Sequence, residues 1–489
     1  MKLQKNIQKN IETIKNYNQN SSDFVDRILD WDGKKIGYIY LESVSSDDKI
    51  SDFLVQNISL IIKNKKSIFD DVYATLKNTI YNSHLLTSDS IEDIFSKLAS
   101  GFTCILVEGC KEAILIETKT KLDRGVSEAT SETVIRGPKD SFTENNSINI
   151  GLIRKRIKDS NLIFKELIIG RRTQSKVNVI YIDDIVEQDK VNNIVQKLEK
   201  IDIDGIIDSG YLRSFLEPVQ KSCFPKFQST ERPDLACTSL LDGKIVILVE
   251  NSPFVLITPS LFVDFIHNPD DYYQKALNVN VTRILRIIAF FMTLLTPGFY
   301  IALTTFNPEI IPNELLISIA IQQSGVPFPT AFEILIMIIA FEILRESDIR
   351  IPNAMGAAVS IVGALILGEA AVSAGVVSPI VIIIVAITSI SGLLFTDIDF
   401  VNALRTWRII FIFFSAFAGL IGFVSCCIIL TLKLCSMEEN GLPYLTPFSP
   451  LYLKDQDDAI RRIPRNKMFF RPTYLTKKNI RRLGDSHEN

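Results

Sequence analysis

Two long uncharged runs near the C-terminus constrain this chain more than any other feature. Residues 351–368 contain 18 positions without a charged side chain, and after Glu369 the run 370–396 contains 27 more. About 20 apolar residues cross the hydrocarbon core of a bilayer, so these runs predict a membrane protein. Gly, Ala and Ser are frequent in the first run, which indicates a helix that packs closely against other helices. Glu369 is a candidate functional residue, because an ionisable side chain at this depth is costly.

Three further segments extend the predicted membrane domain to residues 283–436. Residues 287–308 and 409–432 are uncharged over 22 and 24 positions, and each is predicted to cross the membrane. Residues 314–325 are amphipathic and are predicted to lie at the interface or to re-enter the membrane. The segments 287–308 and 409–432, together with the runs 351–368 and 370–396, give four clear spans.

Residues 330–346 are an ambiguous fifth segment. They carry Glu333 and Glu342, candidate intramembrane acidic residues, about 180° apart on a helix at about 100° per residue. The segment is therefore either buried among other helices or half in water. The count starts from a cytoplasmic N-terminal region. Four crossings leave residues 330–346 as a non-crossing element and place the charged break at 345–350 on the outer side of the membrane. Five crossings place the basic tail on the outer side, against the tendency of Lys and Arg to stay inside. An even count is favoured because the tail carries more charge.

The tail, predicted as residues 437–489, is basic. From position 451 onward it holds ten Lys and Arg against five Asp and Glu, whereas the whole chain has a net charge of −3. Such a segment usually stays in the cytoplasm, where it either contacts anionic lipid or only keeps the tail soluble. A second basic group at 154–158 is predicted to be a solvated helix face or a face that binds an acidic partner or lipid headgroups.

The first 282 residues carry the pattern of a soluble α/β region. Two β-rich hairpins, at 103–118 and 244–258, both contain the string Ile-Leu-Val-Glu. They favour two subdomains that share a strand-turn-strand element, at 1–128 and 129–282, although four matching residues can also arise by chance. The predicted fold class is an α/β two-subdomain soluble region, then an all-α multi-span membrane domain and a basic C-terminal tail.

Signatures of enzymes and metal sites are absent from the sequence. It contains no GxxxxGK[ST] phosphate loop, no HExxH and no GxSxG. The seven cysteines form no CxxC pair, and their odd number indicates reduced thiols and a cytosol-facing soluble region. We therefore predict no enzyme activity, no cofactor, no metal site and no nucleic-acid partner.

Short strings spaced along the chain carry a family resemblance. They include Val134-Ile-Arg-Gly-Pro-Lys-Asp140, Leu152-Ile-Arg-Lys-Arg156, Thr230-Glu-Arg-Pro-Asp234, Pro269-Asp-Asp-Tyr-Tyr273 and Glu342-Ile-Leu-Arg-Glu346. In this order the chain resembles the A subunit of the GerA-type spore germinant receptors, and also the SpoVAF-like paralogues. The residues taken from these strings as candidate site residues are Arg136, Gly137, Pro138, Glu231, Arg232, Pro233 and Asp234.

The resemblance implies a multi-pass protein of the spore inner membrane with a cytosolic N-terminal region. It implies two partners, a transporter-like B subunit and a lipoprotein C subunit, together with self-oligomerisation and contact with membrane lipid. It also implies a nutrient-gated ion conductor that begins germination. Relatives commonly carry Gln where this chain has Glu369, which leaves ion selectivity open.

A candidate pore stripe follows from helix geometry. Val359, Val362 and Ile366 lie at i, i+3 and i+7, on one face. If several copies surround an axis, apolar rings of these residues can gate by dewetting, with Glu369 at the pore mouth or in a tight turn. Ordinary helix packing explains the same stripe. A secondary transporter, with broken helices and midplane charges, and a membrane-anchored scaffold of a germination complex are the alternative functions.

Overall fold

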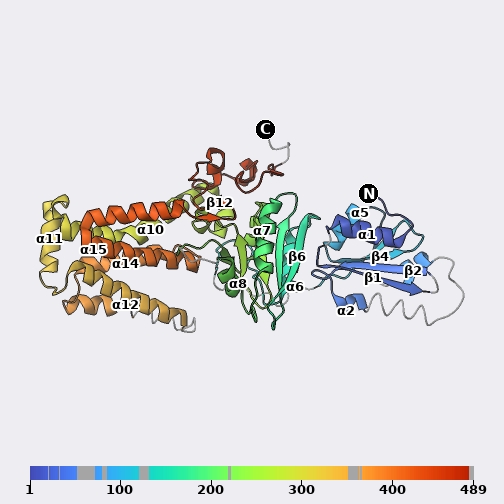
Figure 1. Ribbon diagram of the computed structural model, residues 1–489, viewed down its shortest axis with the longest axis horizontal. Helices are drawn as coiled ribbons and strands as arrows, with labels where there is room; N and C mark the ends of the chain where they lie inside the picture. The colour runs from blue at the N-terminus through green and yellow to red at the C-terminus, as the bar shows by residue number, and fades with distance from the viewer. Residues whose placement is uncertain are drawn as a thin grey trace. The chain divides into compact units, whose positions relative to one another are not determined.

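The computed structural model describes residues 1–19, 21–31, 34–51, 72–79, 85–120, 132–217, 222–350, 363 and 366–483. The chain forms two compact units (Figure 1). The sheet unit contains Met1–Val219, Phe227–Pro259 and Arg465–Asn489, and the helical unit contains Gln220–Lys226 and Ser260–Pro464.

The first half of the sheet unit is a five-stranded antiparallel sheet with strand order β1-β2-β4-β5-β3. Side chains of β4 alternate between its two faces, so that Cys104 and Leu106 pack under helices α1 and α5, while Ile105 and Val107 pack with Leu76 of α4. The elements are α1 (Ile7–Tyr17), β1 (Phe24–Trp31), β2 (Lys34–Leu41), α2 (Asp47–Ile50), α4 (Val72–Thr79), β3 (Leu85–Ser88), α5 (Ile91–Leu98), β4 (Phe102–Val107) and β5 (Ala113–Glu117).

The second half is another five-stranded antiparallel sheet, with strand order β6-β7-β9-β10-β8. Helices α7 and α8 cover one face, and α6 and α9 cover the other (Figure 1). The elements are α6 (Asn146–Arg156), β6 (Leu162–Ile169), β7 (Ser175–Ile182), α7 (Gln188–Glu199), α8 (Ser209–Leu216), β8 (Gln228–Thr230), α9 (Pro233–Leu241), β9 (Ile245–Val249) and β10 (Val255–Thr258).

The two halves repeat one topology. Among the described residues, both run helix, two strands, two helices, strand, helix and two strands, and both place the strands in the same spatial order. The two hairpins noted in the sequence are β4–β5 and β9–β10, which occupy equivalent places. Their turns carry positive φ at equivalent positions, Gly109 (φ 89°) and Asn251 (φ 66°). The prediction of a shared strand-turn-strand element is confirmed.

The helical unit begins with short turns, η2 (Phe262–Phe265) and η3 (Pro269–Tyr272). Residues 366–373 are also helical. The other elements are α10 (Ala276–Ile301), η4 (Ala302–Phe306), η5 (Pro308–Ile310), α11 (Asn313–Gln323), α12 (Thr330–Arg350), α14 (Pro379–Gly392), α15 (Ile398–Cys435), β11 (Glu438–Glu439), β12 (Leu442–Pro443) and η6 (Leu453–Asp458), with η7 (Arg465–Lys467) following in the sheet unit. Among the described residues, two helical stretches, Ala276–Phe306 and Ile398–Cys435, are long and apolar enough to cross a membrane.

Helix α15 reverses direction at Gly419, which has φ 56° and ψ −134°. The ring centroids of Phe411 and Phe423 are 5.6 Å apart, whereas 12 residues of straight helix extend about 18 Å. A Cβ on Gly422 would overlap the carbonyl oxygen of Phe414, so the turn depends on glycine there. The prediction that residues 409–432 form one continuous span is therefore wrong, because Gly419 and Gly422 let the chain fold back into a helical hairpin.

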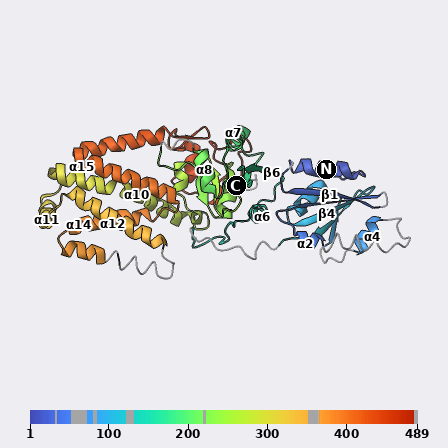
Figure 2. The ribbon, with the colours of Figure 1, turned by 60° about the horizontal axis from the view of Figure 1, so that its bottom comes forward.

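Contacts fix the directions of the helices within the helical unit (Figure 2). The ring centroids of Phe290, on α10, and Phe400, on α15, are 6.3 Å apart. Further along α10, a Cβ on Gly298 would contact Phe411, which lies further along α15. Helix α10 and the first arm of α15 are therefore parallel. Helix α12 runs the opposite way, because its early Ile334 packs near the end of α10 and its later Glu342 pairs with Arg408.

Helix α14 also runs opposite to α10. Its first turns pack near the end of α10, and at its C-terminal end a Cβ on Gly392 would contact Thr293. The helical residues before it run with α10, since Gly363 approaches Leu344 of α12, and Gly375 approaches the carbonyl of Gly325. The helices therefore pass alternately up and down the unit.

Candidate functional site

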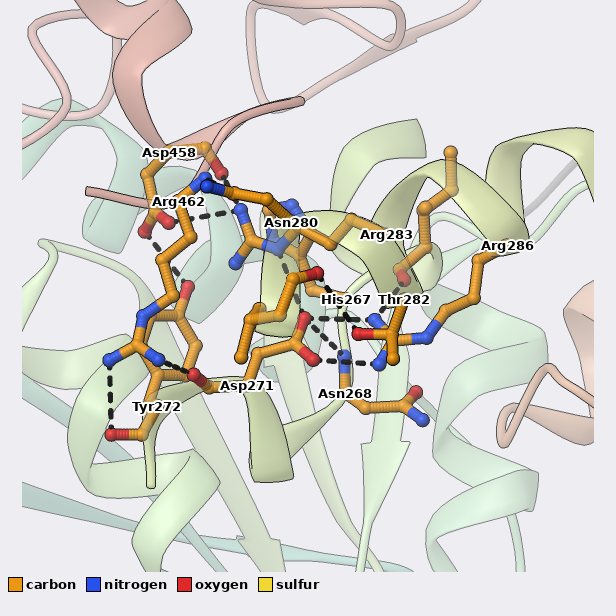
Figure 3. A network of polar contacts seen from close by, with 12 residues as sticks. His267, Asn268, Asp271, Tyr272, Asn280, Thr282, Arg283, Arg286, Asp458 and Arg462 are labelled. Atoms are coloured by element: carbon orange, nitrogen blue, oxygen red, sulfur yellow. Dashed lines mark hydrogen bonds and ion pairs between the residues drawn. The ribbon is translucent and has the colours of Figure 1, made fainter. Parts of the chain in front are cut away.

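A buried polar network lies where α10 begins (Figure 3). Asp271, in η3, accepts hydrogen bonds from Arg283 Nε at 3.0 Å and from Arg286 Nη1 and Nη2 at 2.8 and 2.6 Å. The two arginines lie three residues apart on α10 and so share one face. Arg283 also pairs with Asp458 Oδ1 at 3.1 Å, and Arg462 completes the set. We call these five residues the Asp271 network.

Four residues of the network are buried, and Asp458 is partly exposed. Arg283 is 0% exposed, and Asp271 and Arg462 are 1% and 4% exposed. Burial by itself raises the pKa of Asp271, but hydrogen bonds and charge from Arg286 and Arg283 outweigh it and hold this pKa below the ordinary value of 3.8. Buried charges must be paired and hydrogen-bonded to be tolerated, so these residues constrain one another's positions.

Arg462 holds the segment after η6 against the start of α10. Its Nη1 donates to the carbonyl oxygen of Gln274 at 2.8 Å and to that of Asp271, and its backbone N–H donates to Asn280 Oδ1 at 2.7 Å. Nearby, His267 Nε2 lies 2.8 Å from the carbonyl oxygen of Ala459. Burial and the charge of Arg283 lower the pKa of His267.

Sequence reasoning missed this network. The sequence places Asp271 in a family string and Arg283 and Arg286 just before the predicted span 287–308, but it does not show that these side chains meet. The i, i+3 spacing of the two arginines beside the Asp-Asp pair was the available signal. The network ties the first long apolar helix to a segment 175 residues later in the chain, so it holds these two parts of the helical unit together.

A second cluster surrounds Glu342 on α12, one of the predicted intramembrane acidic residues. Its Oε1 lies 2.8 Å from Arg408 Nη2 and 3.3 Å from Arg405 Nε, both on α15, and its Oε2 lies 3.3 Å from Arg345 Nη2. Arg408 is buried, whereas the other three side chains are partly exposed. We call these four residues the Glu342 cluster.

Glu333, the other predicted intramembrane acid, has a different environment. It is 1% exposed, and its Oε2 accepts a hydrogen bond from the backbone N–H of Ser378 at 2.8 Å. Ser378 is the N-cap of α14, so the carboxylate lies at the positive end of that helix. Glu333 thus connects α12 to α14, while Glu342 connects α12 to α15.

The predicted pore stripe is only partly within the described residues. Val359 and Val362 lie outside them. Ile366 is 59% exposed, and Glu369 is also exposed, on the helical stretch 366–373. Their roles in a pore stay predictions.

Two family strings about 95 residues apart meet in the sheet unit. Arg232, fully buried, donates from Nη2 to the carbonyl oxygen of Pro138 at 3.0 Å and to Asp234 Oδ2 at 2.8 Å. The carbonyl oxygen of Glu231 accepts from the N–H of Phe142 at 2.8 Å. Pro233 occupies the first turn of α9. These residues therefore form one cluster although the sequence separates them.

Glu132 lies under this cluster and is 9% exposed. Its carboxylate accepts a hydrogen bond from Thr230 Oγ1, and its N–H donates to Glu231 Oε1 at 3.1 Å. Burial raises the pKa of Glu132 to about 7. By contrast, Arg136 and Gly137 are exposed, and Gly137 has a φ of 127° that favours glycine. Buried Glu132 and Arg232 thus support the exposed loop that contains Arg136 and Gly137.

The predicted basic face at 154–158 is wrong for its first residue. Arg154 is fully buried between the two sheets, where its Nε and Nη2 reach the two carboxylate oxygens of Asp23 at 3.1 and 3.0 Å. Its guanidinium also lies 4.6 Å from the ring centroid of Phe164. The helical period turns Arg154 inward, away from its basic neighbours, and its charge joins the two halves of the sheet unit.

Part of the basic tail is also packed rather than free. Leu475 and Thr476 are buried, and the carbonyl oxygen of Leu475 accepts from Lys190 Nζ at 3.0 Å. Arg471 Nε donates to the carbonyl oxygen of Leu241 at 2.8 Å. A carbonyl oxygen after α9 therefore binds Arg471, a basic side chain that the sequence alone leaves for lipid or solvent, while Lys190 of α7 holds the tail backbone. Within the described ranges, no group of three or more His, Cys, Asp and Glu is placed to hold a metal ion.

Comparison with known proteins identifies the family. A family model described as Bacillus/Clostridium GerA spore germination protein matches residues 12–474. Spore germination protein KA of Bacillus subtilis (strain 168) is 37% identical over 485 residues, which cover 98% of this chain and 88% of that protein. The protein named Uncharacterized membrane protein YfkQ, from the same organism, is 32% identical over 475 residues, covering 97% and 92%.

Among solved structures, the crystal structure of the N-terminal domain of the A subunit of the Bacillus megaterium spore germinant receptor GerK3 matches with 29% identity and a TM-score of 0.42, covering 54% of this chain and 98% of that chain. The family resemblance seen in the short strings is confirmed by the family model and by the full-length relatives. This chain belongs to the Bacillus/Clostridium GerA family of spore germination proteins.

Proposed function

We propose that the chain is the A subunit of a spore germinant receptor, and that it oligomerises in the spore inner membrane to form a nutrient-gated ion-conducting pore. The observation that carries the germination role is the family match over residues 12–474, together with relatives named as spore germination proteins. The pore is a further inference of ours, and the architecture of the helical unit supports it.

The hairpin supports a multi-pass topology. Successive helical segments, namely α10, α12, residues 366–373, α14 and the two arms of α15, alternate in direction. A hairpin returns the chain to the side from which it came, whether or not its tip reaches the far surface. The count of passes in this proposal is then even, so that α10 begins, α12 ends and α15 ends in the same half of the helical unit.

This arrangement removes the conflict between the two charge patterns. Arg283 and Arg286 begin α10, Arg405 and Arg408 lie in the first arm of α15, and Arg345 lies near the end of α12. Because α12 is antiparallel to the other two helices, all five arginines belong to the same half of the unit. Lys and Arg favour the cytoplasmic side, so we assign that half to the cytosol.

The proposed pore wall is the small-residue run 351–368, with Val362 near the constriction and Glu369 beside it. Apolar rings close such a pore by dewetting, and charged rings select ions. The Asp271 network and the Glu333 contact hold the surrounding helices in place. A transporter-like B subunit and a lipoprotein C subunit complete the receptor in this proposal, with the B subunit sensing the nutrient.

Germinating spores test the proposal. In spores whose own A subunit is replaced by this chain, we expect potassium release to follow nutrient addition. A Val362→Ala substitution is expected to release potassium without nutrient. The control is Val424→Ala, at a side chain 48% exposed on the second arm of α15, which is expected to behave as wild type. Normal nutrient-dependent release in both variants would refute a gate at Val362 and favour the scaffold alternative.

A further inference from the structure

Three guanidinium groups of the Glu342 cluster share one carboxylate. Arg345, Arg405 and Arg408 each lie within 3.3 Å of a Glu342 oxygen, so these four side chains carry two unbalanced positive charges. We propose that this cluster is a binding site for a phosphate group, supplied by the headgroup of an anionic phospholipid.

Unused donors in the cluster support the proposal. The Nε atoms of Arg345 and Arg408 are buried, and neither has a hydrogen-bond partner within the described part of the chain. Arg408 is 3% exposed, so its second donor edge lies inside the protein. A buried N–H without an acceptor is destabilising, and the two positive charges that Glu342 leaves unbalanced favour an anion. Phosphate supplies negative charge, and its oxygens match the planar fork of the partly exposed Arg345 and Arg405.

The same cluster remains accessible from outside. The side chains of Arg345, Arg405 and Glu342 are 31%, 17% and 34% exposed, so a ligand can reach the guanidinium groups without unfolding the helices. Arg405 Nη1 is oriented by Asn402 Oδ1 at 2.9 Å, which reduces the number of rotamers that a ligand must fix. These features describe a preformed site rather than a pair of surface charges.

The surroundings favour a lipid over free phosphate. Arg408 immediately precedes the uncharged run that begins at Ile409. Ile339 lies one helical turn from Glu342, and Ile409 lies one helical turn from Arg405, each towards the apolar part of its helix. These two side chains are 50% and 49% exposed. A headgroup bound by the arginines therefore places its acyl chains beside exposed isoleucines. Anionic lipids of the cytoplasmic leaflet bind basic clusters at this level.

Native mass spectrometry of the full-length chain in detergent tests the proposal. The probes are phosphatidylglycerol, phosphatidylcholine and inorganic phosphate. We expect phosphatidylglycerol to bind at least about tenfold more tightly than phosphatidylcholine, and the double substitution Arg345→Gln with Arg405→Gln to remove most of that preference. Arg172→Gln, an exposed arginine of the sheet unit, removes a charge of the same kind and is expected to leave the preference unchanged.

Three outcomes would overturn the proposal. One is equal binding of the two lipids by the unmodified chain. Another is a preference that survives in the double variant. The third is that inorganic phosphate binds at the cluster as tightly as phosphatidylglycerol does. That result would assign the site to a free anion. If the double variant does not fold, Arg405→Lys serves instead, because it keeps the charge but loses the fork and is expected to weaken the preference only in part.

Discussion

Replacing Asp271 by Asn tests whether the Asp271 network holds the helical unit together. The carboxylate accepts three charge-assisted hydrogen bonds, at 2.6, 2.8 and 3.0 Å, from two arginines that are 0% and 7% exposed. Asn removes the negative charge and turns an N–H₂ group towards guanidinium donors. Removing one partner of a buried ion pair costs roughly 3–5 kcal/mol, so the free energy of unfolding should fall by about that amount.

Fluorescence of Trp407 gives a readout confined to the helical unit. This side chain is 8% exposed and packs in the same apolar cluster as Phe290 and Phe400. In a Trp31→Phe background, thermal unfolding in lipid nanodiscs should report this unit alone. For a domain of roughly 200 residues, at about 2–4 °C per kcal/mol, we expect a fall in Tm of roughly 6–20 °C.

The matched control is Asp457→Asn, the same change at an exposed carboxylate one residue before Asp458. Surface changes of this kind stay within about 0.5 kcal/mol. If Asp271→Asn lowers the Tm no more than Asp457→Asn does, the network does not stabilise the unit, and the reasoning from its burial and hydrogen bonds is wrong.

Three further predictions concern other parts of the chain. Because the pKa of Glu132 rises from 4.5 to about 7, the sheet unit should lose roughly 3 kcal/mol of stability between about pH 4.5 and pH 7, and a urea titration of Glu132→Gln should not show this loss. Gly419→Val should lower the Tm of the helical unit far more than Gly441→Val, since both glycines have positive φ but only the first would clash, with Phe306. Asp23→Asn should raise amide hydrogen exchange in β1 and α6 by opening the contact with Arg154, and unchanged exchange there would refute that role.

The sequence was sufficient to predict the repeated hairpins but not the sheets that contain them. Alternating β-formers and turn residues mark 103–118 and 244–258, since strand pairing across a short turn is a local property. The order β1-β2-β4-β5-β3 depends on which edges pair over long separations, and one sequence carries no direct signal of that. The equivalence of the two halves follows from the two strand orders, which the sequence does not show.

The sequence predicts the long apolar stretches of α10 and α15, but not the reversal within α15. Uncharged length dominates the prediction of a span, so residues 409–432 looked like one helix. The reversal depends on two small residues, Gly419 and Gly422, where a side chain would overlap Phe306 of η4 and the carbonyl oxygen of Phe414; the folded structure alone brings these neighbours there. Glycines are common in packed membrane helices, and so they did not signal a turn.

The polar sites were predicted as residues but not as groups. Glu342 stood out because an acid among apolar residues is costly, yet its partners on α15 lie more than 60 positions away. Arg154 was grouped with its basic neighbours, although the helical period turns it inward onto Asp23. In each case the missing information was tertiary contact, which gives a charge its counter-charge.

The central claim, that this chain forms an ion-conducting pore, is tested most directly by electrical recording. The chain is purified with its Val362→Ala substitution and fused into a planar bilayer, with unmodified chain as the control. We predict discrete single-channel currents for the variant in the absence of nutrient, and closed channels for the unmodified chain. Bilayers that stay silent with the variant, while liposomes containing the same protein accumulate labelled nutrient, would contradict the pore and identify a transporter.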